Sequence, residues 1–213
     1  MTQARKAVSG VRATNPAQPR SYETDAPLIS DWLHIEADGN VIVYTGKVEV
    51  GQHIRTSLAQ AVAEELRVSV NTIRMVMADT DHTPYDMGTV GSRSTPYMAP
   101  HLRIVAAATR EVLLDLAAAH WRVIRTELWV ENGLIQHPPT GRQLSYGELT
   151  QGQALDQEYS SDIPLRPATE WDIAGKGLHS VNAIAMVTGM QQFTPDMSRP
   201  EMLIGAVLRP PSC

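Results

Sequence analysis

The most constraining feature of this sequence is an abrupt change of hydrophobic period within residues 47–66, KVEVGQHIRTSLAQAVAEEL. Before Gly51 the residues alternate in the manner of a β-strand. From Ile54 onwards apolar residues recur every four positions, which places them on one face of a helix. A strand therefore has to turn directly into a helix at Gly51 and Gln52, and glycine is suited to such a turn.

A hairpin precedes this turn. Residues 32–46, WLHIEADGNVIVYTG, alternate on both sides of Asp38 and Gly39, and an Asp-Gly pair supplies the positive φ angles of a tight hairpin. We expect the second strand of this hairpin to continue toward Val50.

A further strand, a loop and a second helix follow. Residues 71–79 predict another strand, residues 80–96 predict a loop, and helically spaced apolar residues predict a second long helix over 102–116. The order strand–strand–helix–strand–loop–helix over residues 30–121 favours an α+β domain with short sheets and two packing helices.

A smaller set of elements follows. Residues 131–133, Glu-Asn-Gly, indicate a hairpin between two short strands. Ser145 and Glu148 have the spacing of a capping box, so a short helix is expected to begin near Tyr146.

Little periodicity is visible in the last third of the chain. Residues 156–174 predict a linker, and residues 202–211, MLIGAVLRPP, predict a strand that ends at two prolines. We expect the partner strands of 202–211 to lie in another chain or in residues that this sequence lacks.

Composition excludes several classes of protein. The net charge of −5 argues against a nucleic-acid partner, because phosphate binding requires clustered Lys and Arg. No run of about 18 apolar residues predicts a transmembrane segment. The single cysteine, Cys213, excludes a disulfide within the chain and a cysteine-rich Fe–S site. Residues 1–30 lack the apolar stretch of a secretory signal, so we expect a flexible arm and a cytoplasmic protein.

The turn at Gly51 is the first candidate binding site. Glycine allows a ligand to approach the backbone closely, and the N–H groups at a helix N-terminus bind anions such as phosphate. Gln52 can both donate and accept hydrogen bonds, which suits the edge of a heterocycle or a phosphate ester. The alternative is a tight connection with a solvated Gln52, and the local residues alone favour that alternative.

The loop MGTVGSRST, residues 87–95, is the second candidate site. Its small residues, its hydroxyl groups and one Arg precede a helix, which is typical of an anion-cradling loop. It matches neither a P-loop nor a dinucleotide fingerprint. The alternative is an ordinary loop in which Ser94 or Thr95 caps the helix.

Other polar residues carry weaker indications. Asp79, Asp81 and Asp86 surround His82, but their spacing matches no known metal motif and we expect them to serve the turn itself. Ser57 has no acid or base at a telling spacing, and Cys213 is a poor nucleophile at a terminus, so no catalytic residue is predicted. His101 and His120 are expected to be surface or packing residues, and His34 lies in a strand of the expected hairpin.

Three segments together resemble the molybdenum-cofactor subunit of the xanthine dehydrogenase/aldehyde oxidase family. They are VIVYTGKVEVGQHIRTSLAQAVAEEL, MADTDHTPYDMGTVGSRST and FTPDMSRPEMLIGAVLRPP, and the similarity extends over residues 30–211. The branch they resemble contains isoquinoline 1-oxidoreductase and nicotinate dehydrogenase-like large subunits.

The resemblance implies a cofactor and a reaction. Members of this family hydroxylate an aldehyde or an aromatic N-heterocycle with a water-derived oxygen at Mo, and the electrons leave through Fe–S clusters on another subunit. Molybdopterin, in bacteria usually as the cytosine dinucleotide, is held by a Gly-Gln-Gly turn and a small-residue loop. The matching residues here are Val50, Gly51, Gln52, Gly91, Ser92, Arg93 and Ser94.

The sequence departs from the family pattern in two ways. His53 replaces the second glycine of the Gly-Gln-Gly turn. Nothing matches the Gly-Glu motif that carries the catalytic base in the family's much longer chains, so the base is expected on a partner chain.

The resemblance also implies a domain organisation. Residues 1–30 are the expected arm, residues 31–155 a molybdopterin-binding-type α+β domain, residues 156–174 a linker, and residues 175–213 the start of an α/β hammerhead domain. The expected partners are a chain with the rest of the molybdopterin and hammerhead domains, an Fe–S subunit and a small-molecule substrate. Two alternatives stay open: a noncatalytic structural or assembly subunit, and a stand-alone anion-binding α/β module.

Overall fold

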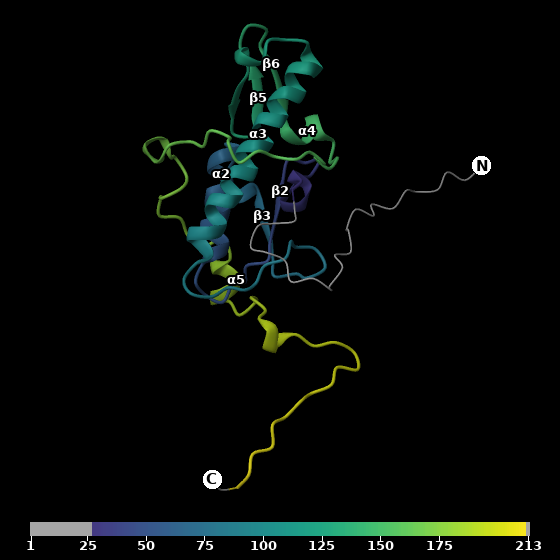
Figure 1. The fold of residues 1–213 in the computed structure, drawn as a ribbon, viewed down its shortest axis with the longest axis vertical. Coiled ribbons are helices and arrows are strands. Elements are labelled where there is room, and N and C mark those ends of the chain that lie inside the picture. The colour runs from purple at the N-terminus through teal and green to yellow at the C-terminus, as the bar shows by residue number, and fades with distance from the viewer. Residues whose placement is uncertain (1–26, 212–213) are drawn as a thin grey trace, which may run out of the picture. The chain divides into compact units, whose positions relative to one another are not determined.

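The computed structural model describes residues 27–211, and it has the expected α+β composition, with two small sheets and packing helices (Figure 1). The contacts of the described residues divide them after Leu178 into two compact units, which we describe separately. Within the described part of the chain, no helix is long and apolar enough to cross a membrane.

The first sheet combines the expected hairpin with a parallel strand. Strands β1 (Leu33–Ile35) and β2 (Val41–Thr45) pair antiparallel across the turn at Gly39, where φ is +88°. Strand β3 (Ile73–Met77) pairs with β2 in parallel, from Val41 opposite Ile73 to Thr45 opposite Met77. The β2 strand ends at Thr45 rather than continuing toward Val50, so the sequence-based extension was wrong: the parallel ladder with β3 stops there.

Helix α2 (Ile54–Leu66) connects the two parallel strands, and α3 (Ala99–Trp121) packs on α2 (Figure 1). Both helices were predicted from their apolar period. Their inner faces and the sheet form one core together with the short helix α1 (Ile29–Trp32). Its fully buried members include Trp32, Val43, Leu58, Val62, Leu66, Leu102 and Leu113.

The second sheet is antiparallel, with strands β4 (Trp129–Glu131), β5 (Leu134–His137) and β6 (Arg142–Ser145). The predicted hairpin between β4 and β5 is confirmed, whereas β6 was not predicted. Helix α4 (Tyr146–Thr150) begins with the predicted capping box, in which Ser145 Oγ accepts from Glu148 N and the Glu148 carboxylate accepts from Ser145 N. The Tyr146 hydroxyl donates to Leu66 O at 2.8 Å and thereby joins α4 to the end of α2.

Short helical turns complete the first unit: η1 (Val70–Thr72), η2 (Ser94–Met98), η3 (Arg125–Glu127) and η4 (Ala168–Glu170). Most of the expected arm lies outside the described residues, but its last residues are described, and Ile29 is fully buried.

Residues 164–177, which we call the strap, run along α2 and α3. The buried Glu64 carboxylate accepts hydrogen bonds from the backbone N–H groups of Asp172, Ile173 and Ala174, at 2.7–3.3 Å. Next to it, the Glu65 carboxylate pairs with Arg103 and Arg110 of α3. Gln60 binds the carbonyls of Ile173 and Lys176, so the strap passes from the end of α2 back toward its beginning. Residues 164–174 belong to the segment expected as a linker.

The second unit contains α5 (Ala183–Val187) and η5 (Thr194–Asp196). The described residues of this unit, 179–211, include no strand. The prediction of a strand at 202–211 is therefore wrong for this chain by itself. A strand requires a hydrogen-bonded neighbour. The apolar side chains of this stretch are almost fully exposed, at 95% for Leu203 and 96% for Leu208.

Candidate functional site

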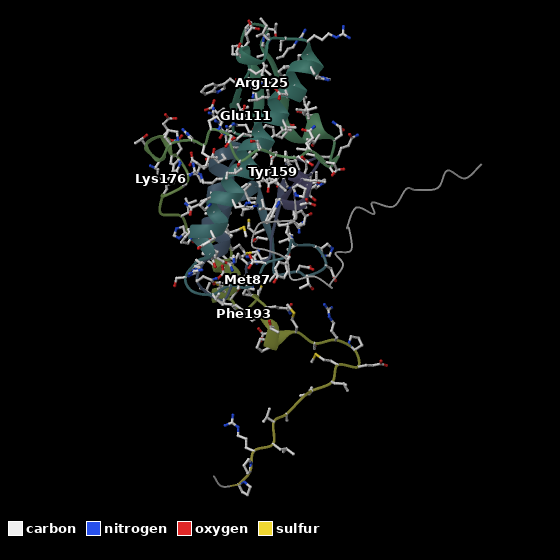
Figure 2. All side chains as sticks on the ribbon, viewed as in Figure 1. Met87, Glu111, Arg125, Tyr159, Lys176 and Phe193 are labelled. Carbon is white, nitrogen blue, oxygen red and sulfur yellow. The ribbon has the colours of Figure 1, made fainter. Side chains whose placement is uncertain are left out.

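The two candidate loops lie at one edge of the first sheet. In a parallel pair the carboxyl ends of both strands meet at the same edge, and that is where ligands bind in open α/β sheets. The loop of residues 46–53, which we call the first loop, leaves the carboxyl end of β2, and the loop of residues 78–93, the second loop, leaves that of β3. Figure 2 shows that Met87, in the second loop, lies far from Glu111 and Arg125, which lie toward the other end of α3.

An ion pair joins the two loops. Lys47 Nζ lies 2.8 Å from Asp86 Oδ1, and each side chain is only 8% exposed. The same ammonium group donates to Gly88 O at 2.9 Å. A neutral contact lies beside it, because Val48 N donates to Thr89 Oγ1 at 2.8 Å.

Glycine is required where the loops approach each other. A Cβ atom on Gly46 would lie 2.3 Å from the Cβ atom of Asp86 and 3.0 Å from Pro84 O. Gly46 thus allows the first loop to pass directly against the second.

A glutamate in the first loop caps helix α2. Glu49 Oε1 accepts hydrogen bonds from Gly51 N and His53 N, and Oε2 accepts one from Arg55 N, at 2.9–3.1 Å. The N–H groups that the sequence left free for a ligand anion are therefore bonded to the chain's own carboxylate. This negative charge also fits the positive end of the helix dipole.

Sequence reasoning missed Lys47 and Glu49, although a signal was present. The buried face of β2 consists of Val41, Val43 and Thr45, and the same alternation continues to Lys47 and Glu49, which are 6% and 8% exposed. Charged residues at inward-facing positions of an alternating pattern indicate buried charges, and buried charges need defined partners.

The Gln52 amide is engaged within its own loop. Its Oε1 atom accepts from Val50 N at 2.7 Å, and its Nε2 atom donates to Val48 O at 2.8 Å. In this arrangement Gln52 shapes the turn and leaves Gly51 at its apex, with φ at +97° and no atom within 4 Å of the position a Cβ would take. Val50 is 68% exposed beside it.

His53, which stands where the family has glycine, lies in a backbone conformation that favours glycine. His53 adopts a left-handed conformation, with φ at 60° and ψ at 26°. This conformation costs a non-glycine residue about 1 kcal/mol. The glycine that the family carries at this position would adopt it without that cost.

The second loop contains four residues with positive φ: Ala78 at 56°, Gly88 at 135°, Gly91 at 63° and Ser92 at 57°. The Arg93 guanidinium lies over the Tyr97 ring, 5.5 Å from its centre. Ser94 begins the π-helical turn η2 that leads into α3, and it is 9% exposed. The alternative in which Ser94 caps this helix is wrong, because Arg93 holds the cap position and no side-chain capping bond is formed.

The acidic residues of the second loop serve the chain itself. Asp79 accepts from Asp81 N at 3.0 Å and lies 3.0 Å from His82 Nδ1, and the hydrogen bond from His82 is the main cause of the lowered pKa of Asp79. Asp86 is paired with Lys47. Within residues 27–211 no group of three His, Cys, Asp or Glu side chains is arranged to hold a metal ion.

The residues set aside in the sequence have ordinary surroundings. His101 stacks edge-on against Trp32, with the ring centres 4.3 Å apart, and burial lowers its pKa. Ser57 donates to Ile54 O within α2. Cys213 lies outside the described residues.

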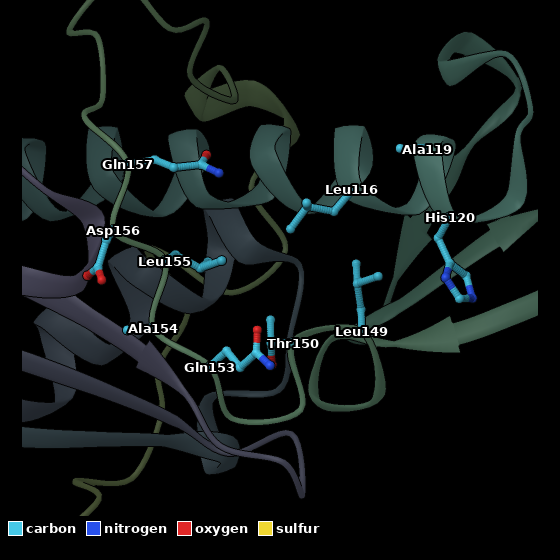
Figure 3. A pocket seen from close by; sticks show the side chains of 10 residues that line it. All are labelled: Leu116, Ala119, His120, Leu149, Thr150, Gln153, Ala154, Leu155, Asp156 and Gln157. Carbon is cyan, nitrogen blue, oxygen red and sulfur yellow. The ribbon is translucent and has the colours of Figure 1, made fainter. Parts of the chain in front are cut away.

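An open cavity of about 540 Å³ lies elsewhere, between the last turns of α3 and residues 149–157 (Figure 3). Leu116, Leu149 and Leu155 line its centre, and His120 lies at one end. The two loops lie at the beginning of α3 and the cavity near its end. At about 1.5 Å per residue these are roughly 30 Å apart, so the cavity is not part of the candidate site.

The fold and this edge define a class of protein. A β–α–β unit that presents two adjacent glycine-containing loops at the carboxyl ends of parallel strands is typical of a domain that binds a ligand at that edge. Comparison with known proteins identifies the class: residues 7–191 match the molybdopterin cofactor-binding domain, and the chain belongs to that family. It corresponds to a molybdopterin-binding portion of a xanthine dehydrogenase-family large subunit, as its sequence resemblance implied.

Individual relatives agree with this assignment. The chain is 34% identical over 180 residues to a subunit of nicotinate dehydrogenase from Pseudomonas putida, and the match covers 84% of this chain and 15% of that protein. It is 30% identical over 146 residues to the beta subunit of isoquinoline 1-oxidoreductase from Brevundimonas diminuta, covering 65% and 19%. Reconstituted CO dehydrogenase from Oligotropha carboxidovorans superimposes on 60% of this chain and 17% of that chain, with a TM-score of 0.51 and 26% identity. The chain thus spans less than a fifth of the length of these relatives.

The residues of the site fit the cofactor of this family. Gly51 and Gly91 are exposed glycines with positive φ on adjacent loops, which allows close approach of a ligand to the backbone. Arg93 supplies a positive charge beside Gly91. Residues Val50, Gly51, Gln52, Gly91, Ser92, Arg93 and Ser94 remain the predicted contacts.

Proposed function

We propose that this chain supplies one wall of the molybdopterin site of a molybdenum hydroxylase and that a partner chain supplies the rest, including the catalytic base. The observation that carries the proposal is the convergence of the two glycine-containing loops at one sheet edge, joined by the Lys47–Asp86 ion pair. The relatives are named as subunits of enzymes, which agrees with a shared site.

In this proposal each loop has its own role. Val50, Gly51 and Gln52 place a backbone turn against the pterin, and Gln52 holds that turn through its bonds to Val48 and Val50. Residues 91–94 face the phosphate, with Arg93 as the charge. When bound, the cofactor supplies the molybdenum that transfers a water-derived oxygen to an aldehyde or an N-heterocycle.

We further propose the cytosine dinucleotide form of molybdopterin and Fe–S clusters on a separate subunit, as in the family that the sequence resembles. The cofactor would be shared between this chain and its partner. Residues 175–213 would begin a hammerhead domain that the partner completes.

The surface around the loops supports a partner chain. Met87, Val90 and Tyr97 are 51–63% exposed, and they lie in the second loop and the turn after it, next in sequence to the proposed cofactor contacts. Exposed apolar groups gathered around a polar site are typical of a protein–protein interface. The partner would cover these groups and close the cofactor site.

Two matched glycine variants test the proposal. Gly51→Ala and Gly141→Ala place the same methyl group at a positive-φ glycine in open space, with φ at +97° and +70°. Gly141 lies in the turn between β5 and β6, away from the loops. In the complex purified from its host, Gly51→Ala should lower the molybdenum content and Gly141→Ala should not.

The purified lone chain should hold no molybdenum and show no hydroxylase activity. Stoichiometric molybdenum in the lone chain would contradict a shared site, and equal molybdenum in both glycine variants would contradict the role of the first loop.

A second candidate function is a noncatalytic assembly subunit. It is favoured by the first loop, because the helix N–H groups are bonded to Glu49 and the Gln52 amide is bonded to its own backbone. A Gln52→Ala complex with full activity and full molybdenum content would support this candidate over the first.

A further inference from the structure

We propose that Lys47 and Asp86 are positioning residues that hold the second loop in its binding conformation before any ligand arrives. The inference rests on the proposed function for its consequence, which is cofactor retention. The loop geometry on which it stands is independent of that function.

The ion pair is closed into a ring of hydrogen bonds. Lys47 Nζ donates to Asp86 Oδ1 at 2.8 Å and to Gly88 O at 2.9 Å. The same Asp86 oxygen accepts from Gly88 N at 2.8 Å. One ammonium group therefore sets both the side chain of residue 86 and the peptide orientation at residue 88.

Gly88 permits this ring because of its conformation. Its φ of +135° is strained for residues with a Cβ atom. The loop then proceeds to Gly91 and Ser92, both also at positive φ. Fixing residue 88 thus fixes the start of the segment that leads to the proposed contacts at residues 91–94.

The later part of the loop, from residue 84 onwards, has few other means of being held. Tyr85, Met87 and Val90 are 57%, 51% and 63% exposed, so its large apolar side chains contribute little burial. Segments with few buried apolar contacts open at low free energy. The buried ion pair, assisted by the Val48–Thr89 hydrogen bond, is the anchor that remains.

The position of Lys47 explains how the anchor stays rigid. Lys47 is 6% exposed, its own N–H donates to Thr45 Oγ1 at 3.3 Å, and Thr45 is the last residue of β2. The position of the ammonium group is thereby fixed by the backbone next to the sheet. Asp86, 39 residues later, is attached to the same sheet through this group.

Hydrogen exchange in the full chain tests the anchor directly. Lys47→Met should accelerate exchange of the amides in residues 86–94 at least about tenfold, while the amides of β2 and α3 keep their rates. Lys47→Arg keeps the charge and should restore most of the protection. Arg125→Met is the matched control, because it breaks an ion pair with Glu111 and Asp115 near the far end of α3.

Asp86→Leu repeats the test from the other side with a side chain of similar shape that cannot accept either hydrogen bond, in case Lys47→Met does not fold. Unchanged exchange of residues 86–94 in a folded Lys47→Met or Asp86→Leu protein would overturn the proposal. An equal increase of hydrogen exchange over the whole domain would also overturn it. Such an increase would mean that the substitution destabilises the fold in general and does not loosen the second loop in particular.

Molybdenum content of the assembled complex supplies the functional readout. Lys47→Met should lower it and Lys47→Arg should restore it. Wild-type complex without any molybdenum would refute the proposed function but leave the exchange result standing. Full molybdenum in a Lys47→Met complex with a loosened loop would refute the role of the anchor in cofactor retention.

Discussion

Different kinds of hydrogen bond hold the two loops of the candidate site. In the first loop the Glu49 carboxylate and the Gln52 amide bond to five backbone groups of the loop and of the first turn of α2. The second loop has internal bonds around Asp79, but its Asp86 accepts a hydrogen bond from Lys47 of the first loop. The first loop is therefore preformed by local chemistry, whereas the second depends on a residue distant in sequence. A ligand that binds both loops would meet a locally fixed first loop and a second loop that is held by its contacts with Lys47 and Val48.

We expect the largest loss of stability from a substitution in the first loop. Glu49→Ala removes three hydrogen bonds to a buried carboxylate and leaves the first N–H groups of α2 without their cap. We expect the free energy of unfolding to fall by about 3 kcal/mol, measured by urea denaturation. Glu131→Ala, on an exposed position of β4, is the control and should change it little. A loss below about 1 kcal/mol would mean that water replaces the cap without difficulty.

A second buried carboxylate of the domain binds backbone N–H groups in the same way. Glu64 binds three strap N–H groups as Glu49 binds those of α2. Burial raises the pKa of Glu64, but the hydrogen bonds from Ala174, Ile173, Asp172 and Arg166 outweigh it, and the pKa is lowered. Glu64→Gln should reduce the free energy of unfolding by about 2 kcal/mol at pH 7.

The lowered pKa of Glu64 also sets the sign of a pH effect. The stabilisation is present above the pKa of about 4.3 that a glutamate has in the unfolded chain, and it is lost as pH falls through the lower folded value. Wild type should therefore lose stability relative to Glu64→Gln below about pH 4.3, so that the two denaturation midpoints converge. Parallel midpoints from pH 7 to pH 3 would contradict this role of the ionised carboxylate.

A smaller change sharpens the comparison at the second loop. Thr89→Val keeps the shape of the side chain and removes only the hydrogen bond from Val48 N. Loss of this single neutral bond should lower stability by about 1 kcal/mol in thermal unfolding, and it should increase hydrogen exchange of the second loop less than Lys47→Met does. Thr83→Val, which removes a hydrogen bond to Asp79 O, is the control on the same loop. Equal exchange in the Thr89→Val and Lys47→Met proteins would remove the distinction between the two anchors.

The smallest expected effect is a gain. His53→Gly relieves the left-handed conformation at φ 60°, but glycine also has more freedom in the unfolded chain. The net stabilisation should be below about 1 kcal/mol, visible as a higher denaturation midpoint. A clear destabilisation would show that the His53 side chain makes contacts worth more than the strain.

Much of the fold was predictable because its signals are local. The Asp38-Gly39 turn, the helical face from Ile54 and the Ser145–Glu148 capping box each require only neighbouring residues, and all three are confirmed. The strand at 202–211 failed for the complementary reason. Its residues favour an extended chain, but a strand also needs a neighbour, and residues 179–211 provide none.

The candidate site was predictable only in part. Both loops were identified from glycines and small residues, and the family resemblance placed them together. Lys47 and Glu49 were missed because the sequence does not show which groups they contact. Lys47 binds Asp86 and Gly88, 39 and 41 residues away, and Glu49 binds N–H groups that only the folded turn presents to it.

The sequence by itself determined the types of the main elements, the turn at Gly51 and the family. The tertiary structure alone decided that β2 and β3 run parallel, and this pairing brings the two loops to one edge. It also decided that Asp86 meets Lys47. The physical reason is that hydrophobic period and turn chemistry act between near neighbours. The pairing of strands and of buried charges is instead selected by the whole packed domain.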